Sequence, residues 1–216
     1  MVELPERGFV KICGVTNVDD ARAVLSSGAS ALGLIFAASP RQVTREQARG
    51  VVEATNGDLL RSAVFRDDES EFILDTVRDL NVEMVQIHGN LNKELLAALR
   101  ASGLLIVKAL DIEGDEFSTF DETLVDAVLV DGPRPGSGTA HSWERLVERR
   151  FRVPLIAAGG LSPFNVADTI LVTNSWGVDC ASGVEVSPRK KDHGLVNDFV
   201  ANARQAFASM EGSRAN

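Results

Sequence analysis

The sequence predicts an α/β fold, a single (β/α)8 TIM barrel with eight parallel strands and outer helices. Eight short apolar runs follow one another along the 216 residues, and most of the gaps hold a segment of helical length and pattern. Each run ends on reactive or conformationally special residues, as at Cys13, Asp131 and Gly159-Gly160. In this fold the carboxyl ends of the strands form the active-site face. Several runs are apolar at consecutive positions, which strands covered on both faces require.

The apolar runs and the turn residues around them define the expected elements. Strands are expected over 9–12, 31–36, 60–65, 82–87, 104–110, 125–130, 153–158 and 176–180. Three of the helices carry start signals, because Asn17 and Asn92 are N-cap residues and Thr44 with Gln47 forms a capping box. Helices are expected over 17–28, 44–55, 69–80, 92–103, 142–150 and 192–210, and another begins near Pro163.

The least regular part is the acidic segment 111–123, which we expect to form a loop with a short, weak helix. An open, doubly wound sheet is the alternative to a barrel. That fold usually has a G-x-G-x-x-G turn after its first strand, and this chain has Cys-Gly-Val-Thr there. A barrel uses nearly the whole chain, so we expect one domain over 1–216, with a flexible leader (1–8) and a flexible tail (211–216).

Composition excludes several classes of partner. The net charge of −9 argues against nucleic acid, whose binding needs a basic face, but it leaves room for a small anion held by local amides and cations. Two cysteines are too few for a disulfide framework, and no apolar targeting stretch opens the sequence, so we expect a reducing, cytoplasmic location. No stretch approaches the roughly 18 consecutive apolar residues of a membrane span.

Two glycine-containing turns predict a phosphate site. Gly159-Gly160 follows the seventh strand, and Ser182-Gly183 follows the eighth. Glycine lets a phosphate oxygen approach the backbone, and the loops after strands seven and eight are the usual phosphate site of a barrel. Each pair alone is also explained by a tight turn between strand and helix. Their occurrence together in the two expected loops favours phosphate binding.

Cys13 and Asp131 are the candidate acid–base pair. They end strands one and six, which both open on the mouth of a closed barrel. A thiolate is a competent general base, and Lys11, on the same face of its strand, would favour that thiolate. Partial burial would keep Asp131 protonated as a general acid. The alternatives are that Cys13 is a small buried apolar residue and that Asp131 is a turn residue.

Two further side chains at strand ends are candidates for substrate contact. Arg41 has the fork that binds a carboxylate at two points, although it also fits a solvated loop. His88 contacts either the ligand or a neighbouring loop. Cys180 lies inside the eighth apolar run and is expected in the core. We find no spacing of His, Cys and carboxylates typical of a metal site, so no metal is expected.

Seven stretches together resemble the phosphoribosylanthranilate isomerase family. They are VKICGVTNVDDA at 10–21, GLIFAASPRQVT at 33–44, VQIHG at 85–89, LVDG at 129–132, GSGTAHSW at 136–143, IAAGGLSPFNV at 156–166 and GVDCASGVEVSPRKKDH at 177–193. The resemblance covers the chain from the first strand to the last helix, in the family's order. It implies a TIM barrel that performs an Amadori rearrangement of N-(5-phosphoribosyl)anthranilate to 1-(o-carboxyphenylamino)-1-deoxyribulose 5-phosphate in tryptophan biosynthesis.

The resemblance also implies roles for individual residues. Asp131 would protonate the furanose oxygen, Cys13 would remove the C2′ proton, and Arg41 would lie near the anthranilate ring. The phosphate loops would use four residues, Gly159, Gly160, Ser182 and Gly183. No cofactor is implied, since only protons move. The expected assembly is a monomer or homodimer.

Two positions depart from the family pattern. His141-Ser142 stands where the family has Phe-Asp, which affects a loop that touches the substrate, and Arg66 stands where an aliphatic residue is common. Other functions on such a barrel are a sugar-phosphate epimerase or indole-forming synthase, which would need a metal or paired lysine and glutamates. A non-catalytic barrel that binds phosphoribosyl metabolites is a further alternative, which the intact pair of Cys13 and Asp131 disfavours.

Overall fold

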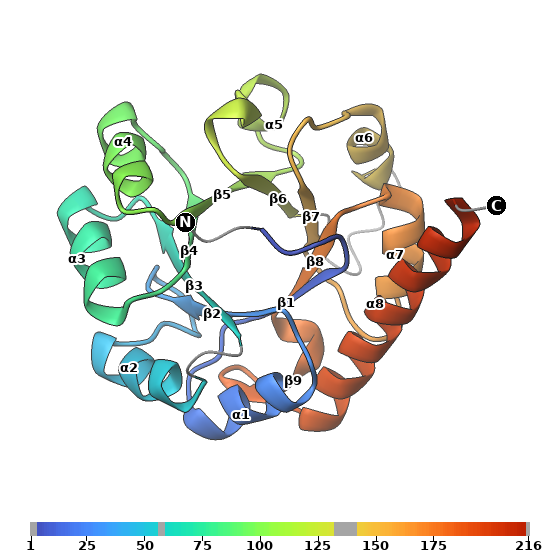
Figure 1. Cartoon of the computed structure of the whole chain (residues 1–216), viewed down its shortest axis with the longest axis horizontal. Helices are drawn as coiled ribbons and strands as arrows, with labels where there is room; N and C mark the ends of the chain where they lie inside the picture. The colour runs from blue at the N-terminus through green and yellow to red at the C-terminus, as the bar shows by residue number, and fades with distance from the viewer. Residues whose placement is uncertain (1–3, 56–58, 132–141, 215–216) are drawn as a thin grey trace.

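The computed structural model describes residues 4–55, 59–131 and 142–214, and it confirms the predicted barrel. Eight parallel strands close into a ring in chain order, so β1 pairs with both β2 and β8 (Figure 1). An open doubly wound sheet is thereby ruled out. The strands are β1 Phe9–Cys13, β2 Ala31–Ile35, β3 Leu60–Arg66, β4 Met84–His88, β5 Leu105–Asp111, β6 Ala127–Asp131, β7 Leu155–Ala158 and β8 Gly177–Cys180.

Helices surround the ring of strands (Figure 1). Those described are α1 Val18–Ser26, α2 Arg45–Ala54, α3 Ser70–Leu80, α4 Lys93–Ala101, α5 Glu116–Thr119, α6 Ser142–Glu148, α7 Val166–Thr173 and α8 His193–Arg214, with 3-10 turns η1 Glu122–Leu124 and η2 Ser182–Val184. All three predicted start signals are confirmed. Asn17 and Asn92 accept hydrogen bonds from backbone amides of the first turn, and Thr44 with Gln47 forms both bonds of a capping box. The weak helix predicted within 111–123 is present as α5 and η1.

Five strands, β1 and β3 to β6, end one residue later than the apolar pattern predicts. Parallel pairing continues through their last residues, which are Cys13, Arg66, His88, Asp111 and Asp131. After β8, the chain forms a short antiparallel hairpin, β9 Glu185–Ser187 with β10 Lys190–Lys191, which the sequence analysis did not anticipate. Both differences add charged side chains to the active-site face.

The core has two layers. Side chains of one face of each strand pack with the helices, and a second cluster that includes Phe9, Met84 and Leu129 fills the barrel interior. The interior also holds buried polar side chains, namely Lys11, Ser62, Gln86, Lys108 and Asp179. Such alternation of two buried faces explains why the strands read as continuous apolar runs.

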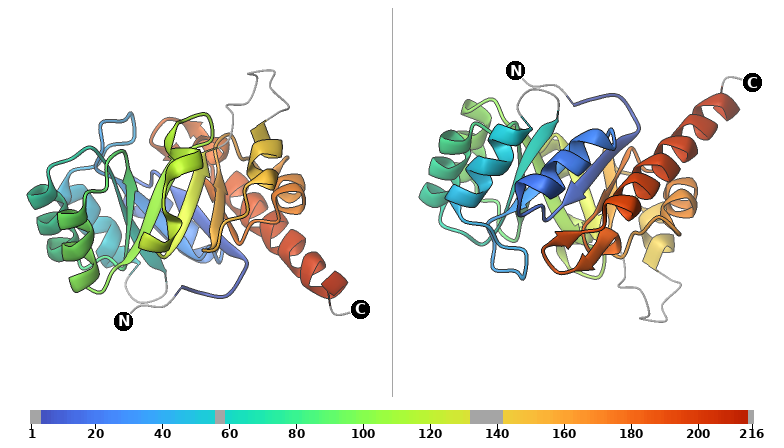
Figure 2. Two further views of the ribbon diagram at one scale, coloured as in Figure 1. Left: turned by 90° about the horizontal axis from the view of Figure 1, so that it is seen from above. Right: turned by 90° about the horizontal axis from the view of Figure 1, so that it is seen from below.

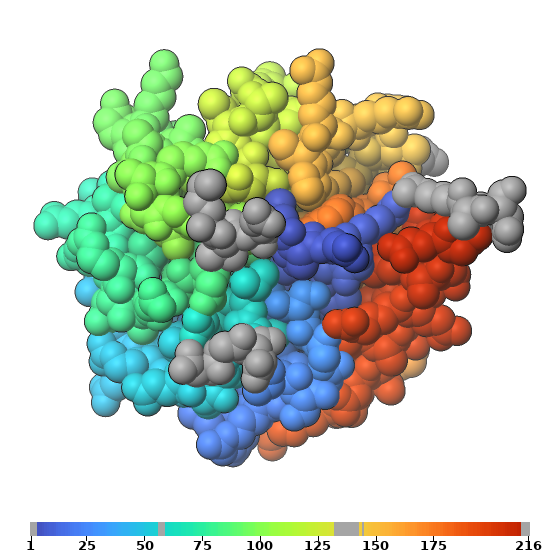
Figure 3. Space-filling view, in the orientation of Figure 1, coloured from blue at the N-terminus to red at the C-terminus, as the bar shows by residue number. Residues whose placement is uncertain are grey.

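The described residues near both ends of the chain form defined elements or contacts. Leu4 packs against the interior cluster, Arg7 Nη2 donates to Asn174 Oδ1 at 2.7 Å, and Gly8 N donates to Trp176 O at 3.0 Å. The described leader residues therefore lie across the amino-terminal opening of the barrel, as the space-filling view shows (Figure 3). The predicted flexible tail is helical through Arg214, and α8 extends past the barrel (Figure 2). Among the described residues, no helix combines the length and apolar character needed to cross a membrane.

Candidate active site

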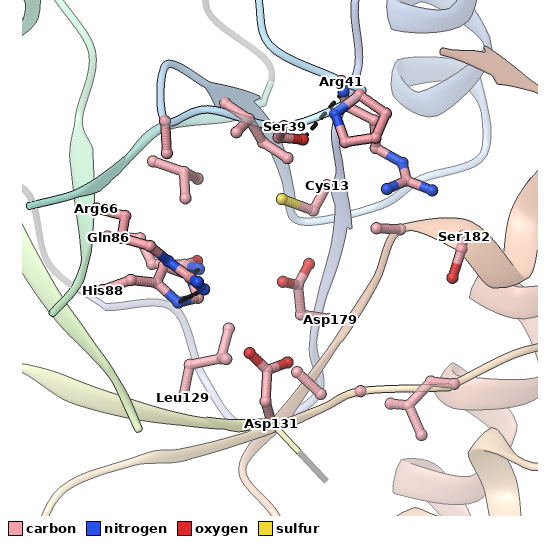
Figure 4. A pocket seen from close by; sticks show the side chains of 18 of the residues that line it. Cys13, Ser39, Arg41, Arg66, Gln86, His88, Leu129, Asp131, Asp179 and Ser182 are labelled. Atoms are coloured by element: carbon pink, nitrogen blue, oxygen red, sulfur yellow. Dashed lines mark hydrogen bonds between the residues drawn. The ribbon is translucent and has the colours of Figure 1, made fainter. Parts of the chain in front are cut away.

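A cavity of about 490 Å³ opens at the carboxyl ends of the strands (Figure 4). Its size suits a small-molecule ligand. Seven of the nine residues predicted for the site line it: Cys13, Arg41, His88, Asp131, Gly159, Gly160 and Ser182. Lys11 and Gly183 are not among its lining residues. Four further polar side chains, which the sequence analysis did not place in the site, also line it: Ser39, Arg66, Gln86 and Asp179.

Cys13 is held at the end of β1 with its sulfur toward the cavity (Figure 4). Gly33 stands opposite on β2, where a Cβ atom would lie only 2.7 Å from Cys13 Sγ, so glycine there leaves room for the thiol. Burial raises the pKa of the Cys13 thiol, although Lys11 and Lys191 each pull it down. Lys11 thus acts in the predicted direction, but burial outweighs it and the resting group is a thiol.

Asp131 ends β6 and faces the same cavity as Cys13 (Figure 4). Burial, with the negative charge of Asp179 second, raises the pKa of Asp131 to about 6. A carboxyl group with this pKa keeps its proton more often near neutrality than an exposed one, which suits a general acid. A thiol and a carboxyl group, each with a pKa raised by burial, therefore open on one cavity.

Asp179 is the most informative residue that sequence reasoning missed. It lies on β8 beside Lys11 of β1, and Lys11 Nζ donates to Asp179 Oδ2 at 2.8 Å and to Gln86 Oε1 at 3.0 Å. Asp179 Oδ1 is buried and has no hydrogen-bond partner within the described part of the chain. The sequence did carry a signal for this residue. Successive side chains of a strand point to opposite faces, so when Cys180 packs against the helices, Asp179 must face the barrel interior.

Lys11, which we expected to favour the Cys13 thiolate and counted with the substrate-binding residues, lies beneath the cavity rather than on its wall. Its side chain is fully buried, one interior layer below Cys13, with its ammonium group bound to Asp179 and Gln86. Burial alone would lower the pKa of Lys11, but the Asp179 carboxylate outweighs burial and raises it. Lys11 therefore supports the site from beneath, as a permanent cation.

The two glycine-containing turns follow β7 and β8, as expected. Glycine is needed in each turn for a different physical reason. Gly159 and Gly160 have φ of +86° and +66°, backbone conformations that favour glycine, and both line the cavity with Ser182. At Gly183 a Cβ atom would lie 1.9 Å from Leu161 O, so glycine is required there for close packing of the β8 turn on the β7 turn. Gly183 is the middle residue of the 3-10 turn η2.

Arg41 does not present the open fork that a carboxylate clamp needs. Its Nε and Nη2 atoms donate to Glu185 Oε1 and Oε2 at 2.7 and 2.6 Å. Lys191, which is also buried, donates to Glu185 Oε1 at 3.0 Å, to Cys13 O at 2.7 Å and to Ala181 O at 2.9 Å. This network joins the ends of β1 and β8 to the β9–β10 hairpin. Sequence reasoning assigned no role to Glu185 or Lys191.

Arg66, Gln86 and His88 form a polar group on the β3–β4 side of the cavity (Figure 4). Gln86 Nε2 lies 2.8 Å from His88 Nε2, and Arg66 Nη2 lies 3.3 Å from His88 Nδ1. Burial and the charge of Arg66 lower the pKa of His88 to about 4, so its ring is neutral at physiological pH. His88 thus lines the cavity, next to an arginine at the position that departs from the family pattern.

Within the residues the structure describes, no group of three or more His, Cys, Asp or Glu side chains is arranged to hold a metal ion. The predicted substrate-touching loop with His141 lies outside the described residues.

Comparisons with known proteins place these features in a family context. The family model for N-(5′-phosphoribosyl)anthranilate (PRA) isomerase matches residues 10–202. The N-(5′-phosphoribosyl)anthranilate isomerase of Haloferax volcanii is 36% identical over 211 residues, which cover 94% of this chain and 96% of that protein. The crystal structure of phosphoribosyl anthranilate isomerase from Thermotoga maritima aligns with a TM-score of 0.82 and 34% identity, covering 91% of this chain and 98% of the other.

Two further solved structures bear on ligand and assembly. A phosphoribosyl anthranilate isomerase in complex with reduced 1-(o-carboxyphenylamino)-1-deoxyribulose 5-phosphate aligns with a TM-score of 0.76 and 34% identity, over 91% of this chain and 98% of that one. A structure of monomers generated from the dimeric Thermotoga maritima protein aligns with a TM-score of 0.75 and 33% identity, over the same shares of the two chains.

Proposed function

Because this chain belongs to the N-(5′-phosphoribosyl)anthranilate isomerase family, we propose that it converts N-(5-phosphoribosyl)anthranilate into 1-(o-carboxyphenylamino)-1-deoxyribulose 5-phosphate, a step of tryptophan biosynthesis. The observation that carries this proposal is that Cys13 and Asp131 open on one cavity, beside the two turns that follow β7 and β8. An Amadori rearrangement needs an acid, a base and an anchored sugar, and these residues supply all three.

Asp131 and Cys13 act in sequence in the proposed mechanism. Asp131 gives its proton to the furanose oxygen while the bond from that oxygen to C1′ breaks, and the anthranilate nitrogen supplies the electron pair for an iminium. The Cys13 thiolate then removes the proton from C2′, and the C–H electrons move toward the iminium to give an enolamine. Tautomerisation of the enolamine gives the ketone product. No electron acceptor is required from outside, because the iminium takes up the electrons itself.

The productive protonation state has a thiolate at Cys13 and a carboxylic acid at Asp131. The pKa of Asp131 is about 6 and that of the thiol lies above its ordinary value, so in the neutral range the pair shares one proton that resides mainly on sulfur. The form with that proton on Asp131 is a minor one, whose share does not change with pH in this range. We expect kcat/KM to rise with pH through about 6 and then to level.

We propose that the 5′-phosphate binds at Gly159, Gly160 and Ser182. The first two provide backbone that a phosphate oxygen can approach closely, and all three line the cavity. Gly183 serves this site through packing, since it brings the β8 turn against Leu161. Arg41 has only its Nη1 side left for substrate, because Glu185 occupies the other edge. We still expect Arg41→Ala to raise KM.

The proposed setting follows from the same residues. A thiol that serves as base must stay reduced, which supports a cytoplasmic location, and both cysteines are free. The partner is the small-molecule substrate, with no nucleic acid, membrane or cofactor. The assembly is a monomer or a homodimer, the latter being the state described for the Thermotoga maritima protein.

The test is turnover of N-(5-phosphoribosyl)anthranilate by the purified protein, followed through the loss of anthranilate-type fluorescence, with and without a chelator. We expect turnover that needs no added metal and that the chelator does not change. Binding of the substrate without turnover would instead indicate a non-catalytic barrel. Absence of both would overturn the proposed function and return attention to other sugar-phosphate chemistry.

A further inference from the structure

We propose that the β9–β10 hairpin positions Arg41 for the substrate, with Glu185 fixing its side chain and Arg189 fixing the backbone on both sides of it. This inference rests on the proposed function, because Arg41 is the residue that would meet the aromatic acid of that substrate. Glu185 and Arg189 are not among the residues that line the cavity, so they would act through Arg41 rather than on the substrate itself.

The guanidinium of Arg41 is fixed along one edge. Its Nε and Nη2 atoms donate to the two carboxylate oxygens of Glu185 at 2.7 and 2.6 Å. Burial alone would raise the pKa of Glu185, but the hydrogen bond from Arg41 and the charge of Lys191 outweigh burial and lower it, so Glu185 stays an anion. A pair bonded at two points restricts both the position and the rotation of the guanidinium. The Nη1 side is therefore the side left for a ligand.

The aliphatic part of the Arg41 side chain lies against the backbone directly after Cys13. A Cβ atom at Gly14 would lie only 2.5 Å from Arg41 Cδ, so glycine there leaves room for the arginine. Gly14 has φ of +73°, a left-handed conformation that favours glycine. The side chain of Arg41 is thus confined between Gly14 and Glu185.

Arg189 holds the chain on either side of Arg41. Its Nη1 atom donates to Gln42 O at 2.7 Å and to Pro40 O at a longer 3.4 Å. These carbonyls belong to the residues immediately before and after Arg41. One guanidinium at the tip of the hairpin therefore sets the direction in which the Arg41 side chain leaves its loop.

The backbone of Arg189 is strained for its residue type. Its φ is +75°, a conformation that glycine adopts readily and that other residues rarely adopt. Thr16 Oγ1 donates to Arg189 O at 3.0 Å and holds this turn against the loop after β1. Glycine would satisfy the turn with less strain, so turn geometry does not explain an arginine here. The contacts of its side chain with the loop of Arg41 do.

The base of the hairpin is anchored to the barrel. Lys191 lies opposite Glu185 in the hairpin, and its buried ammonium group donates to Cys13 O at 2.7 Å and to Ala181 O at 2.9 Å. The hairpin is therefore fixed to the ends of β1 and β8, and it can support Arg41 at a constant place relative to Cys13. We expect this support to matter for binding of the aromatic acid, which Arg41 would contact, more than for proton transfer.

The test measures the affinity of two ligands by calorimetry. One ligand is reduced 1-(o-carboxyphenylamino)-1-deoxyribulose 5-phosphate, and the other is the same compound with an unsubstituted phenyl ring. The proteins are wild type, Arg189→Met, Arg189→Gly, Glu185→Gln and the control Lys190→Met, which removes a positive charge from an exposed position of the same hairpin. Arg189→Met is also made in an Arg41→Ala background. Thermal unfolding shows whether each variant folds, and turnover of the substrate is measured in parallel.

We expect Arg189→Met and Arg189→Gly to weaken the carboxylated ligand by about three- to tenfold and to leave the unsubstituted ligand within about twofold of wild type. KM should rise by a similar factor while kcat stays within about twofold. Glycine suits the backbone of this turn, so Arg189→Gly tests the side chain even if Arg189→Met does not fold. Lys190→Met should bind both ligands as wild type does.

The Arg41→Ala background separates positioning from a general effect on the fold. Once Arg41 is absent, Arg189→Met should change the affinity for the carboxylated ligand by less than about twofold. Glu185→Gln should act in the same direction as the Arg189 variants and more strongly, because the amide places a donor beside Arg41 Nη2.

Three results would overturn the positioning role even if wild-type turnover supports the isomerase. They are an equal loss for both ligands in the Arg189 variants, no loss for either, and an undiminished loss in the Arg41→Ala background. Tighter binding of the carboxylated ligand by Glu185→Gln would also overturn it, because Glu185 would then compete with the ligand for Arg41. Wild-type protein that shows the expected Arg189 dependence of binding but no turnover would keep the positioning role and refute the proposed function.

Discussion

Two walls of the cavity differ in how completely their charges are paired. In the paired wall Arg41 lines the cavity, and Glu185 and Lys191 lie behind it. Two cations there satisfy one carboxylate and tie it to the ends of β1 and β8. The open wall, made of Arg66, His88 and Asp131, holds a cation beside a neutral imidazole and a carboxyl group whose pKa is raised to about 6. The difference teaches that the paired wall maintains the shape of the mouth, whereas the open wall keeps polar groups that a ligand can bind.

The largest effect should come from Cys13→Ala, because the thiol faces the cavity while Lys191 of the paired wall holds the Cys13 carbonyl. We expect kcat to fall by about 10²–10⁴-fold with little change in KM. Steady-state kinetics on N-(5-phosphoribosyl)anthranilate measure this. Cys180→Ala is the matched control, since that buried sulfur packs in the outer core and donates to Leu161 O. Retention of more than about a tenth of kcat in Cys13→Ala would place the base elsewhere.

The next largest effect is expected for Lys191→Met, which should lower the stability of the protein and so tests the paired wall. The substitution leaves a mostly buried Glu185 with one cation and leaves the carbonyls of Cys13 and Ala181 without their donor. Removing one partner of a buried ion pair costs about 3–5 kcal/mol in the free energy of unfolding. Urea denaturation measures the loss. A change below about 1 kcal/mol would show that the wall does not hold the mouth together.

Asp131→Asn should change the free energy of unfolding by less than Lys191→Met does, and it should raise that free energy rather than lower it. The folded-state pKa is raised, so the favourable contribution of the protonated carboxyl is present below the ordinary pKa of 3.8 and is lost as pH rises through about 6. We therefore expect the variant to be more stable than wild type at pH 8, by up to about 3 kcal/mol, and equal to it near pH 3. Denaturation at both pH values tests this.

The same substitution sharpens the assignment of the acid. In wild type kcat/KM should level above pH 6, and in Asp131→Asn the small residual activity should keep rising across the neutral range, because only the Cys13 thiol then titrates. An unchanged pH profile would remove Asp131 from the acid role.

The smallest effect is expected for Arg49→Ala, which breaks a pair with Asp79 on the outer surface, far from either wall. Both partners are well exposed, so the free energy of unfolding should change by less than about 1 kcal/mol. Urea denaturation alongside Lys191→Met gives the comparison. A loss as large as that of Lys191→Met would mean that pairing alone, rather than burial, sets the difference between the walls.

Local signals were enough to predict the barrel and the two strand-end residues. The N-caps at Asn17 and Asn92, the capping box at Thr44 and the apolar runs depend on neighbours in sequence, and the structure confirms them. Cys13 and Asp131 could be placed at one mouth because a closed parallel barrel brings all its carboxyl strand ends together.

The residues that sequence reasoning missed depend on distant partners. Lys191 contacts the carbonyl of Cys13 across 178 positions, and Arg41 meets Glu185 across 144. No local pattern reports such a contact, so the sequence left Arg41 as either a carboxylate clamp or a solvated loop residue. Gly183 shows a second limit of sequence reasoning. Close packing against Leu161 O requires glycine there, and a phosphate-binding loop would also favour glycine, so the residue type alone does not distinguish the two roles.

The pairing of β1 with β8 has a consequence for how the chain is made. Lys11 and Asp179, which meet across this pairing, are 168 positions apart, so a ribosome releases the first strand long before its last neighbour has been synthesised. Throughout that interval the nascent chain carries an exposed strand edge and a lysine without its counter-charge, and such edges promote aggregation. Closure of the ring and assembly of the chemical machinery therefore coincide, because both depend on the same late strand.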